Sequence, residues 1–165
     1  MIDPGPPGVD LAVSASPFDG AARRLVHGLK YGRRLALAGE AAAAMLRALP
    51  PREAQGAVVP VPAGRWRRAR RGFDPAYEIA AALAVRSGLP LIECLGRGRG
   101  RRQVGRPRSD RLADPPRVWA TARCPPTVLL VDDVWTTGAT LEACAEALRG
   151  AGTRRIVALT LAHAL

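Results

Sequence analysis

Two adjacent acids at the end of an apolar run are the residues of this chain best suited to chemistry. The segment from Val128 to Leu141 reads VLLVDDVWTTGATL, and its first four residues lead directly into Asp132 and Asp133. Carboxylate oxygens accept hydrogen bonds from the vicinal hydroxyls of a sugar, or hold a metal ion bound to those hydroxyls. We therefore expect Asp132 and Asp133 to lie in a catalytic site.

The turn after these acids has the residue types of a phosphate site, namely Thr136, Thr137, Gly138, Ala139 and Thr140. Gly138 lets the backbone approach an anion closely. The first N–H groups of the helix that follows point toward the turn, and threonine hydroxyls add donors. A ligand that places a phosphate at the turn and a diol at the acids would have the groups of a ribose 5-phosphate. Neither a GxxxxGK[ST] nor a GxGxxG signature is found, which excludes the two commonest nucleotide-binding loops.

Alternating apolar and helical patterns predict the elements that position this site. Helices are expected over 20–32, 35–49, 75–88 and 141–152, the third with Asp74 as N-cap and Pro75 as first residue. Strands are expected over 57–61, 89–95, 118–121, 127–133 and 154–164. This alternation predicts one α/β domain, with a mostly parallel sheet flanked by helices.

The proline-rich start and one arginine-rich stretch lack periodicity. Residues 1–17 contain four prolines and are expected to form an irregular arm before a domain over 18–165. Within that domain, residues 96–116 have seven arginines and no apolar pattern, so we expect a flexible basic loop.

The composition favours an anionic partner. The 165-residue chain has a formal net charge of +11, and Lys30 is the only lysine among its 25 basic residues. Arginine suits bidentate contact with phosphate, in a small molecule or in nucleic acid, although a general compositional bias explains the excess equally well. Three distant cysteines, no signal-peptide pattern and no apolar run of about 20 residues predict a cytoplasmic protein without a membrane segment.

A second basic cluster follows the strand expected over 57–61. Its arginines are Arg65, Arg67, Arg68, Arg70 and Arg71. They form either a solvated basic turn or a surface that faces the same ligand. The second alternative is favoured by their position directly after a strand of the same sheet. Trp66 and Trp135 flank the expected site, and each either stacks on a base or packs in the core.

The segment around Asp132 and Asp133 resembles the phosphoribosyl diphosphate (PRPP) motif of type I phosphoribosyltransferases. The chain is similar in particular to the ComF family, which is linked to DNA uptake in natural competence. The similarity extends over about residues 18–162, through PVP and RRGFDPA (residues 60–62 and 70–76) and Lys30-Tyr31-Gly32. It implies a type I phosphoribosyltransferase-like fold, Mg²⁺ held indirectly by Asp132 and Asp133 through the ribose, and arginines of the 65–71 cluster, chiefly Arg65, Arg67, Arg68 and Arg71, at the pyrophosphate.

The resemblance also implies a flexible loop carrying Gln103 and Arg111. Three positions depart from the family pattern. Asp74 replaces an asparagine, Arg101 or Arg102 stands where threonine is usual before Gln103, and Asp114 stands in place of a second asparagine. The four-cysteine zinc module of many family members has no counterpart here.

Three functions remain open from the sequence. The first is a PRPP and Mg²⁺ binder that transfers the phosphoribosyl group to an unknown nitrogen acceptor. The second is an inactive accessory of DNA uptake that binds single-stranded DNA or other competence proteins, for which the charge and the GRGRGRR stretch are the motive. The third is a regulator that senses PRPP.

Overall fold

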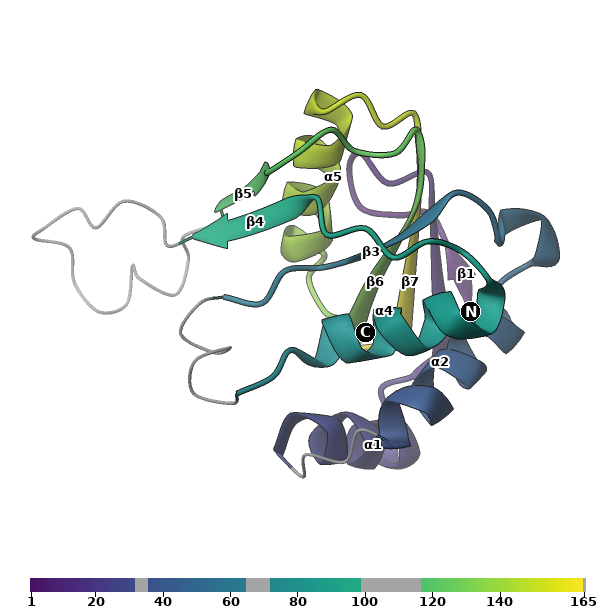
Figure 1. The fold of residues 1–165 in the computed structure, drawn as a ribbon. Helices are drawn as coiled ribbons and strands as arrows, with labels where there is room; N and C mark the ends of the chain where they lie inside the picture. The colour runs from purple at the N-terminus through teal and green to yellow at the C-terminus, as the bar shows by residue number, and fades with distance from the viewer. Residues whose placement is uncertain (32–35, 65–71, 99–116, 165) are drawn as a thin grey trace, which may run out of the picture.

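The computed structural model describes residues 1–31, 36–64, 72–98 and 117–164, which form an α/β fold (Figure 1). The strands are β1 (Ile2–Asp3), β2 (Leu11–Pro17), β3 (Ala57–Pro60), β4 (Leu95–Gly98), β5 (Arg117–Ala120), β6 (Thr127–Trp135) and β7 (Arg155–His163). The helices are α1 (Gly20–Tyr31), α2 (Ala36–Ala48), the short 3-10 helix η1 (Pro51–Glu53), α4 (Pro75–Ser87) and α5 (Ala139–Gly150).

The main sheet is mixed and mostly parallel, as expected. Its described strands lie in the order β1-β2-β7-β6-β3, in which β2, β7, β6 and β3 run parallel and β1 pairs antiparallel with β2. A separate antiparallel hairpin, β4–β5, extends beside α5 (Figure 1).

Apolar residues alternate between the two faces of the sheet, and each face has its own helical cover. Leu129, Val131 and Val157 pack in one cluster with Met45 of α2 and Leu83 of α4. The neighbouring residues of the same strands pack in a second cluster with α5 and the hairpin, and they include Val128, Leu130, Ile156 and Ala158. Burial on both faces explains why these strands read as continuous apolar runs in the sequence.

The chain leaves β3 and β6 in opposite directions. From β3 it passes through α4 to Leu91, which forms a parallel bridge with Val58 on the edge of β3 away from β6. Val58 uses both its N–H and its carbonyl there, on Pro90 and Ile92. From β6 the chain passes through α5 to β7 on the other side. The carboxyl ends of β3 and β6 therefore border a topological switch point, where open α/β sheets bind ligands.

Helix α4 begins and ends where the sequence predicts. The Asp74 side chain caps its first turn through the Ala76 N–H at 3.2 Å, and Pro75 follows at the first helical position. The helix stops at Gly88, whose φ of 72° lies in the left-handed region that favours glycine.

Two expectations about the strands are wrong. Residues 1–17 are not an irregular arm, because β2 pairs with β7 over much of its length and the Ser14 hydroxyl lies 2.8 Å from that of Thr160 in the core. The stretch 89–95 is not a strand beyond the Leu91 bridge, since the next strand, β4, begins at Leu95. The first residues of the stretch expected to be a flexible loop, Gly96 to Gly98, are thus part of the hairpin, and residues 99–116 lie outside the described ranges.

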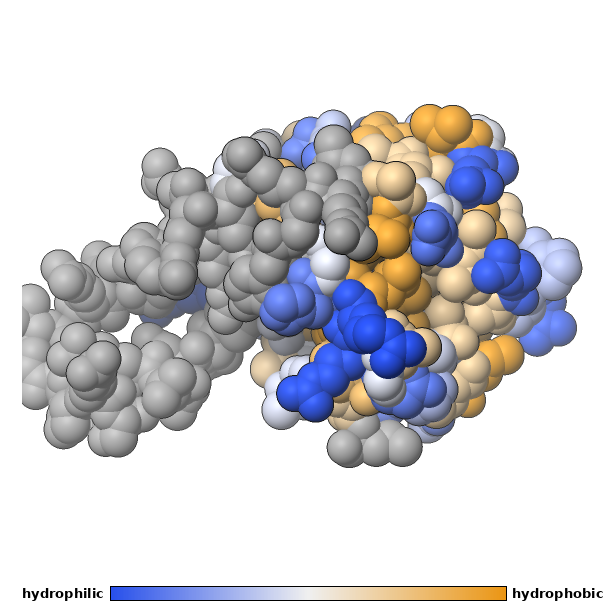
Figure 2. Space-filling model, turned by 90° about the horizontal axis from the view of Figure 1, so that it is seen from below, coloured by the Kyte–Doolittle hydropathy of each residue, from blue (hydrophilic) through white to orange (hydrophobic). Residues whose placement is uncertain are grey.

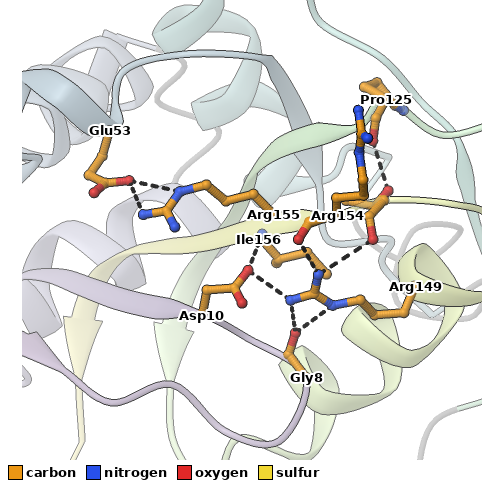
Figure 3. Close-up of polar contacts among 9 residues, drawn as sticks. Gly8, Asp10, Glu53, Pro125, Arg149, Arg154, Arg155 and Ile156 are labelled. Atoms are coloured by element: carbon orange, nitrogen blue, oxygen red, sulfur yellow. Dashed lines mark hydrogen bonds and ion pairs between the residues drawn. The ribbon is translucent and has the colours of Figure 1, made fainter.

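A polar network stabilises the end of the sheet at which β7 begins (Figure 3). The Arg149 guanidinium donates to the Gly8 carbonyl and to Asp10 Oδ2, the latter at 2.7 Å, and the Ile156 N–H donates to the same Asp10 oxygen at 2.7 Å. Arg155 pairs with the buried Glu53 at 2.6 Å. These contacts join α5, η1 and the approach to β2, so they are structural rather than part of a ligand site.

Figure 2 shows the molecule from below Figure 1, the side on which α1 lies. Apolar surface is exposed there between scattered hydrophilic residues. None of the helices in the described ranges is both long enough and apolar enough to cross a membrane.

Candidate functional site

A cavity of about 320 Å³ opens at the switch point between the carboxyl ends of β3 and β6. Its described lining comes from five parts of the chain: the residue after β2, the residues after β3, the start of α4, the hairpin, and the end of β6 with the start of α5. The lining residues are Phe18, Val61, Pro62, Ala63, Asp74, Pro75, Ala76, Arg97, Asp132, Asp133, Val134, Thr136 and Thr140.

The two predicted acids lie in this cavity at the end of β6. Asp133 is 8% exposed and Asp132 is half-buried. The Asp132 carboxylate accepts a hydrogen bond from the Asp133 N–H at 2.8 Å, which fixes its orientation relative to the strand. Successive residues of a strand point to opposite faces, so the two carboxylates reach the cavity from different sides of the sheet edge.

The predicted phosphate turn joins β6 to α5 and is built on Gly138. Gly138 has a φ of 82° and serves as the N-cap of α5 without a side-chain cap in the described structure. A Cβ at this position would lie 3.1 Å from the Pro6 Cβ and 3.2 Å from the Trp135 Nε1, so both the backbone and the space demand glycine. The helix therefore begins with N–H groups not bonded within the helix, an arrangement that favours anions.

The predicted turn residues contribute unequally to the cavity. Thr136 and Thr140 line it, whereas the Thr137 side chain is exposed and Ala139 is half-buried outside the lining. The spacing of four between Thr136 and Thr140 brackets the start of α5, so the hydroxyls flank the helix N-terminus. Both therefore remain candidates for phosphate contact.

The chain after β3 forms the facing wall and is held in place by Asp74. The Val61 N–H donates to the Val131 carbonyl at 2.8 Å, which extends the pairing of β3 with β6 up to the acids. The Ala63 N–H donates to Asp74 Oδ2 at 3.0 Å, while the other Asp74 oxygen caps α4. Asp74 is 9% exposed, and it ties together the two ends of the segment from Ala63 to Ala76.

The remaining predicted site residues lie outside the described residues. They are Arg65, Arg67, Arg68, Arg70, Arg71, Gln103 and Arg111, and Trp66 lies outside as well. Their relation to the cavity stays a prediction.

Arg97 of β4 is a site residue that the sequence did not single out. Its Nη1 donates to the Pro62 carbonyl at 3.4 Å, and the side chain lines the cavity. In the hairpin Arg97 pairs with the half-buried Val118, while Gly96 and Gly98 on either side leave room for the Trp119 ring. The G-R-G pattern around Arg97 is not a sufficient signal, because Arg99 also lies between two glycines in the sequence.

Two charged side chains of the cavity, Asp132 and Arg97, affect the pKa of one buried thiol, that of Cys144. Burial raises the pKa of the Cys144 thiol well above its usual range, the Asp132 carboxylate raises it further, and the Arg97 guanidinium lowers it. Cys144 itself packs in the core.

Trp135 packs rather than offering a free face at the site. Its ring stacks on the His163 ring with centroids 3.9 Å apart and planes 7° from parallel, and its side chain is almost fully buried. His163 Nδ1 lies 3.9 Å from Asp3 Oδ2 of β1. The stack joins the ends of β6 and β7 directly below the Gly138 turn.

The described part of the cavity offers carboxylate oxygens as possible ligands for a metal ion. No cluster of three or more His, Cys, Asp or Glu side chains with metal-binding geometry is found among the described residues. Asp132 and Asp133 supply carboxylate oxygens, and Mg²⁺ is commonly held by one or two carboxylates together with phosphate oxygens and water. The acids therefore suit an indirect role toward Mg²⁺.

Comparison with known proteins identifies no relative of this chain: no family model, curated protein or solved structure matches it.

Proposed function

We propose that the protein binds PRPP together with Mg²⁺ in the cavity between β3 and β6. One observation carries the proposal: two acids at the carboxyl end of β6 and two threonines at the N-terminus of α5 line the same cavity. Asp132 and Asp133 are suited to the ribose hydroxyls, and Thr136 and Thr140 with the helix N-terminus to the 5-phosphate. The resemblance to the ComF branch of type I phosphoribosyltransferases supports the same ligand.

The reaction that fits this arrangement is transfer of the phosphoribosyl group to a nitrogen acceptor. The bond from the anomeric carbon to the diphosphate oxygen breaks, a nitrogen–carbon bond forms, and pyrophosphate leaves with the bonding electrons. Positive charge develops on the sugar, so the carboxylates of Asp132 and Asp133 stabilise it while they orient the ring. Mg²⁺, when bound, would neutralise part of the pyrophosphate charge.

A ComF-type protein would act in the cytoplasm during DNA uptake, beside other competence proteins. A regulator that senses PRPP would use the same cavity without turnover. Release of pyrophosphate with a nucleobase or amine distinguishes the two, because a sensor binds PRPP and releases none.

Thermal melting with ribose 5-phosphate, and with PRPP plus Mg²⁺, tests the proposal. A ligand at about 100 times its Kd stabilises a protein by roughly 2.7 kcal/mol, which raises the Tm of a chain of this size by about 5–10 °C. Asp132→Asn keeps an oxygen for the Asp133 N–H but removes the charge, and it should abolish most of the shift. Glu146→Gln, on the exposed side of α5, is the matched control and should preserve it. An unchanged Tm of the wild type at millimolar ligand would reject the proposal.

A second function, binding of single-stranded DNA, is favoured by the outer face of the hairpin. Trp119 is 48% exposed, and Arg117 shares its face of β5. Gly96 and Gly98 of β4 lie beneath the Trp119 ring, so it is held against the hairpin. Thr121 and Arg123, which follow, are exposed too. An aromatic ring between arginines is the arrangement on which bases stack while phosphates are bound.

Fluorescence anisotropy with a labelled oligothymidine at several salt concentrations tests this second function. Trp119→Ala should weaken binding by about tenfold, as stacking contributes roughly 1–3 kcal/mol per base. Val85→Ala, which removes an exposed apolar side chain from α4, is the control. Affinity that does not fall with salt, or that survives loss of Trp119, would argue against it.

A further inference from the structure

The turn between β6 and α5 packs at its glycine against two side chains that do not line the cavity. A Cβ at Gly138 would lie 3.1 Å from the Pro6 Cβ and 3.2 Å from the Trp135 Nε1. From the same turn, Thr136 and Thr140 line the cavity, whereas Pro6 and Trp135 do not. The turn therefore presents its threonines to the cavity while its glycine rests on a proline and an indole.

The segment that carries Pro6 follows α5 along its length. A Cβ at Gly8 would lie 3.1 Å from the Ala145 Cβ, in the middle of the helix. In the last turn of the helix, the Arg149 guanidinium donates to the Gly8 carbonyl at 3.0 Å and to Asp10 Oδ2 at 2.7 Å. Contacts at the beginning, the middle and the end of α5 thus fix this segment to the helix, so the position of Pro6 is set relative to the whole of α5.

A tight turn gives the same segment its shape. The Val9 N–H donates to the Pro6 carbonyl at 3.0 Å, and Pro7 and Gly8 lie between them, Gly8 with a φ of 83°. Proline at the second position and glycine at the third are typical of a type II turn. Val9 is buried in the core cluster that includes Leu148 of α5. Local sequence and core packing therefore both hold Pro6 in place.

The Trp135 indole is in turn supported by the end of β7. Its ring stacks on the His163 ring, with centroids 3.9 Å apart, and the two residues pair in register. Asp3 Oδ2 of β1 lies 3.9 Å from His163 Nδ1, and both atoms are buried without a hydrogen-bond partner among the described residues. The segment over residues 3–10 therefore reaches the turn in two ways, directly through Pro6 and indirectly through His163 and Trp135.

We propose that Pro6 and the Trp135–His163 stack are positioning residues for the turn at Gly138, so that residues 3–10 raise the affinity of the cavity for a 5-phosphate without donating to it. This inference rests on the proposed function for the identity of the ligand. Backbone N–H groups bind an anion tightly when their directions are fixed before the anion arrives. Glycine has no side chain to restrict its own backbone, so packing by its neighbours must do so.

Calorimetric titration with ribose 5-phosphate and with inorganic phosphate tests the inference, at a temperature at which every variant is folded. Pro6→Gly removes the ring that packs on Gly138. Both ligands should then bind about threefold to tenfold more weakly, which is roughly the effect of one lost hydrogen bond. Pro4→Gly makes the same change at an exposed proline of the same segment, and it should bind both ligands as the wild type does.

Two substitutions at His163 separate positioning from general stability. His163→Leu removes the aromatic stack and should weaken ribose 5-phosphate binding by about threefold to tenfold. His163→Phe keeps a ring on the Trp135 indole and should restore most of that affinity. Side chains that only stabilise the fold would lower the Tm of these variants and leave the dissociation constant of the folded protein unchanged.

The outcomes separate this inference from the proposed function. Normal binding by the wild type with an unchanged dissociation constant in Pro6→Gly, or in folded His163→Leu, overturns the inference and leaves the ribose 5-phosphate site standing. Equal weakening in Pro4→Gly and Pro6→Gly, or in His163→Phe and His163→Leu, overturns it as well.

Two further results bear on both proposals. Weaker binding of inorganic phosphate in Pro6→Gly, together with unchanged binding of ribose 5-phosphate in Asp132→Asn, supports the inference and overturns the phosphoribosyl assignment. Failure of the wild type to bind either compound overturns both. Should His163→Leu not fold, the comparison of Pro6→Gly with Pro4→Gly carries the same decision.

Discussion

Replacement of Gly138 by alanine should damage both the stability and the ligand site, and the structure separates the two effects. A non-glycine residue in the left-handed region costs about 1–2 kcal/mol. The φ of Gly138 is 82°, and an added Cβ would meet Pro6 at 3.1 Å and Trp135 at 3.2 Å. Those contacts are tight enough to add a few tenths of a kcal/mol or more, so we expect a total loss of about 1.5–3 kcal/mol.

Gly152 provides a matched control for the backbone term. Its φ is 95°, and an added Cβ would meet nothing within 4 Å. Gly152→Ala should therefore lose only the conformational part, about 1–2 kcal/mol. With a Tm change of roughly 2–4 °C per kcal/mol at this chain length, scanning calorimetry should find a decrease of about 3–12 °C for Gly138→Ala and of about 2–8 °C for Gly152→Ala.

The two variants should differ more clearly in ligand binding. Gly138→Ala changes the turn at the N-terminus of α5, so ribose 5-phosphate should bind at least tenfold more weakly than to wild type. Gly152→Ala, beyond the far end of α5, should bind it normally. If Gly138→Ala were as stable as the wild type, the strain argument would be refuted. If it were destabilised yet bound the ligand with full affinity, the phosphate role of the turn would be refuted.

Three further predictions concern other parts of the chain. Asp74→Ala should lower the free energy of unfolding by about 1–3 kcal/mol in urea titration, because it removes the acceptor for two backbone N–H groups, and Asp74→Asn should recover part of it. Arg149→Ala should destabilise by about 1–3 kcal/mol through loss of its contacts to Gly8 and Asp10, whereas Arg47→Ala should change stability little. Burial, and to a lesser degree Cys124, raises the pKa of the Cys94 thiol to about 12. The unfolded thiol ionises near pH 8.5, whereas the buried thiol stays protonated to a higher pH. The contribution of this thiol to the free energy of unfolding is therefore complete below pH 8.5 and is lost as the pH rises toward 12. The urea midpoint should therefore fall less steeply between about pH 8 and pH 10.5 in Cys94→Ala than in the wild type, and identical slopes would contradict the assignment.

The parallel core could be predicted from the sequence because both faces of each strand are buried. The runs Ala57–Pro60, Thr127–Trp135 and Arg155–His163 are apolar almost throughout, and they became β3, β6 and β7. The capping pattern around Asp74 was equally informative, since capping depends on local hydrogen bonds.

Strand β2 could not be recognised in the same way. Its sequence LAVSASP contains two serines and follows a proline-rich stretch, so neither composition nor periodicity indicated a strand. The pairing with β7 and the buried contact between Ser14 and Thr160 stabilise it, and both depend on residues far away in the chain. The opposite error, over residues 89–95, has a related cause. The apolar residues there pack beside β3 and form only a single bridge with it, not a continuous hydrogen-bonded ladder. Pro90 also has no N–H to donate.

The residues that line the cavity could be predicted where they lie close together in the sequence, and not where they come from a distant hairpin. Asp132, Asp133, Thr136 and Thr140 follow one strand and begin one helix, so their convergence is local. Arg97 lies on β4, which pairs with β5. Residues 99–116 separate these two strands in the sequence, so the position of Arg97 depends on pairing rather than on local sequence. Among the seven arginines from Arg97 to Arg111, no local signal distinguishes the one that lines the cavity, since Arg99 also has a glycine on either side in the sequence.

The balance of charge around the cavity leads to a last expectation about Mg²⁺. The described lining has the carboxylates of Asp74, Asp132 and Asp133 against the guanidinium of Arg97. Two unit charges about 4 Å apart interact by roughly 4 kcal/mol at an effective dielectric constant of 20, so carboxylates at this distance repel a diphosphate. PRPP should therefore bind at least tenfold more weakly when Mg²⁺ is removed with a chelator, whereas ribose 5-phosphate, which lacks the diphosphate, should change much less. Equal affinity for PRPP with and without Mg²⁺ would mean that protein cations neutralise the diphosphate, and the arginines between Arg65 and Arg71 would then be the residues to replace next.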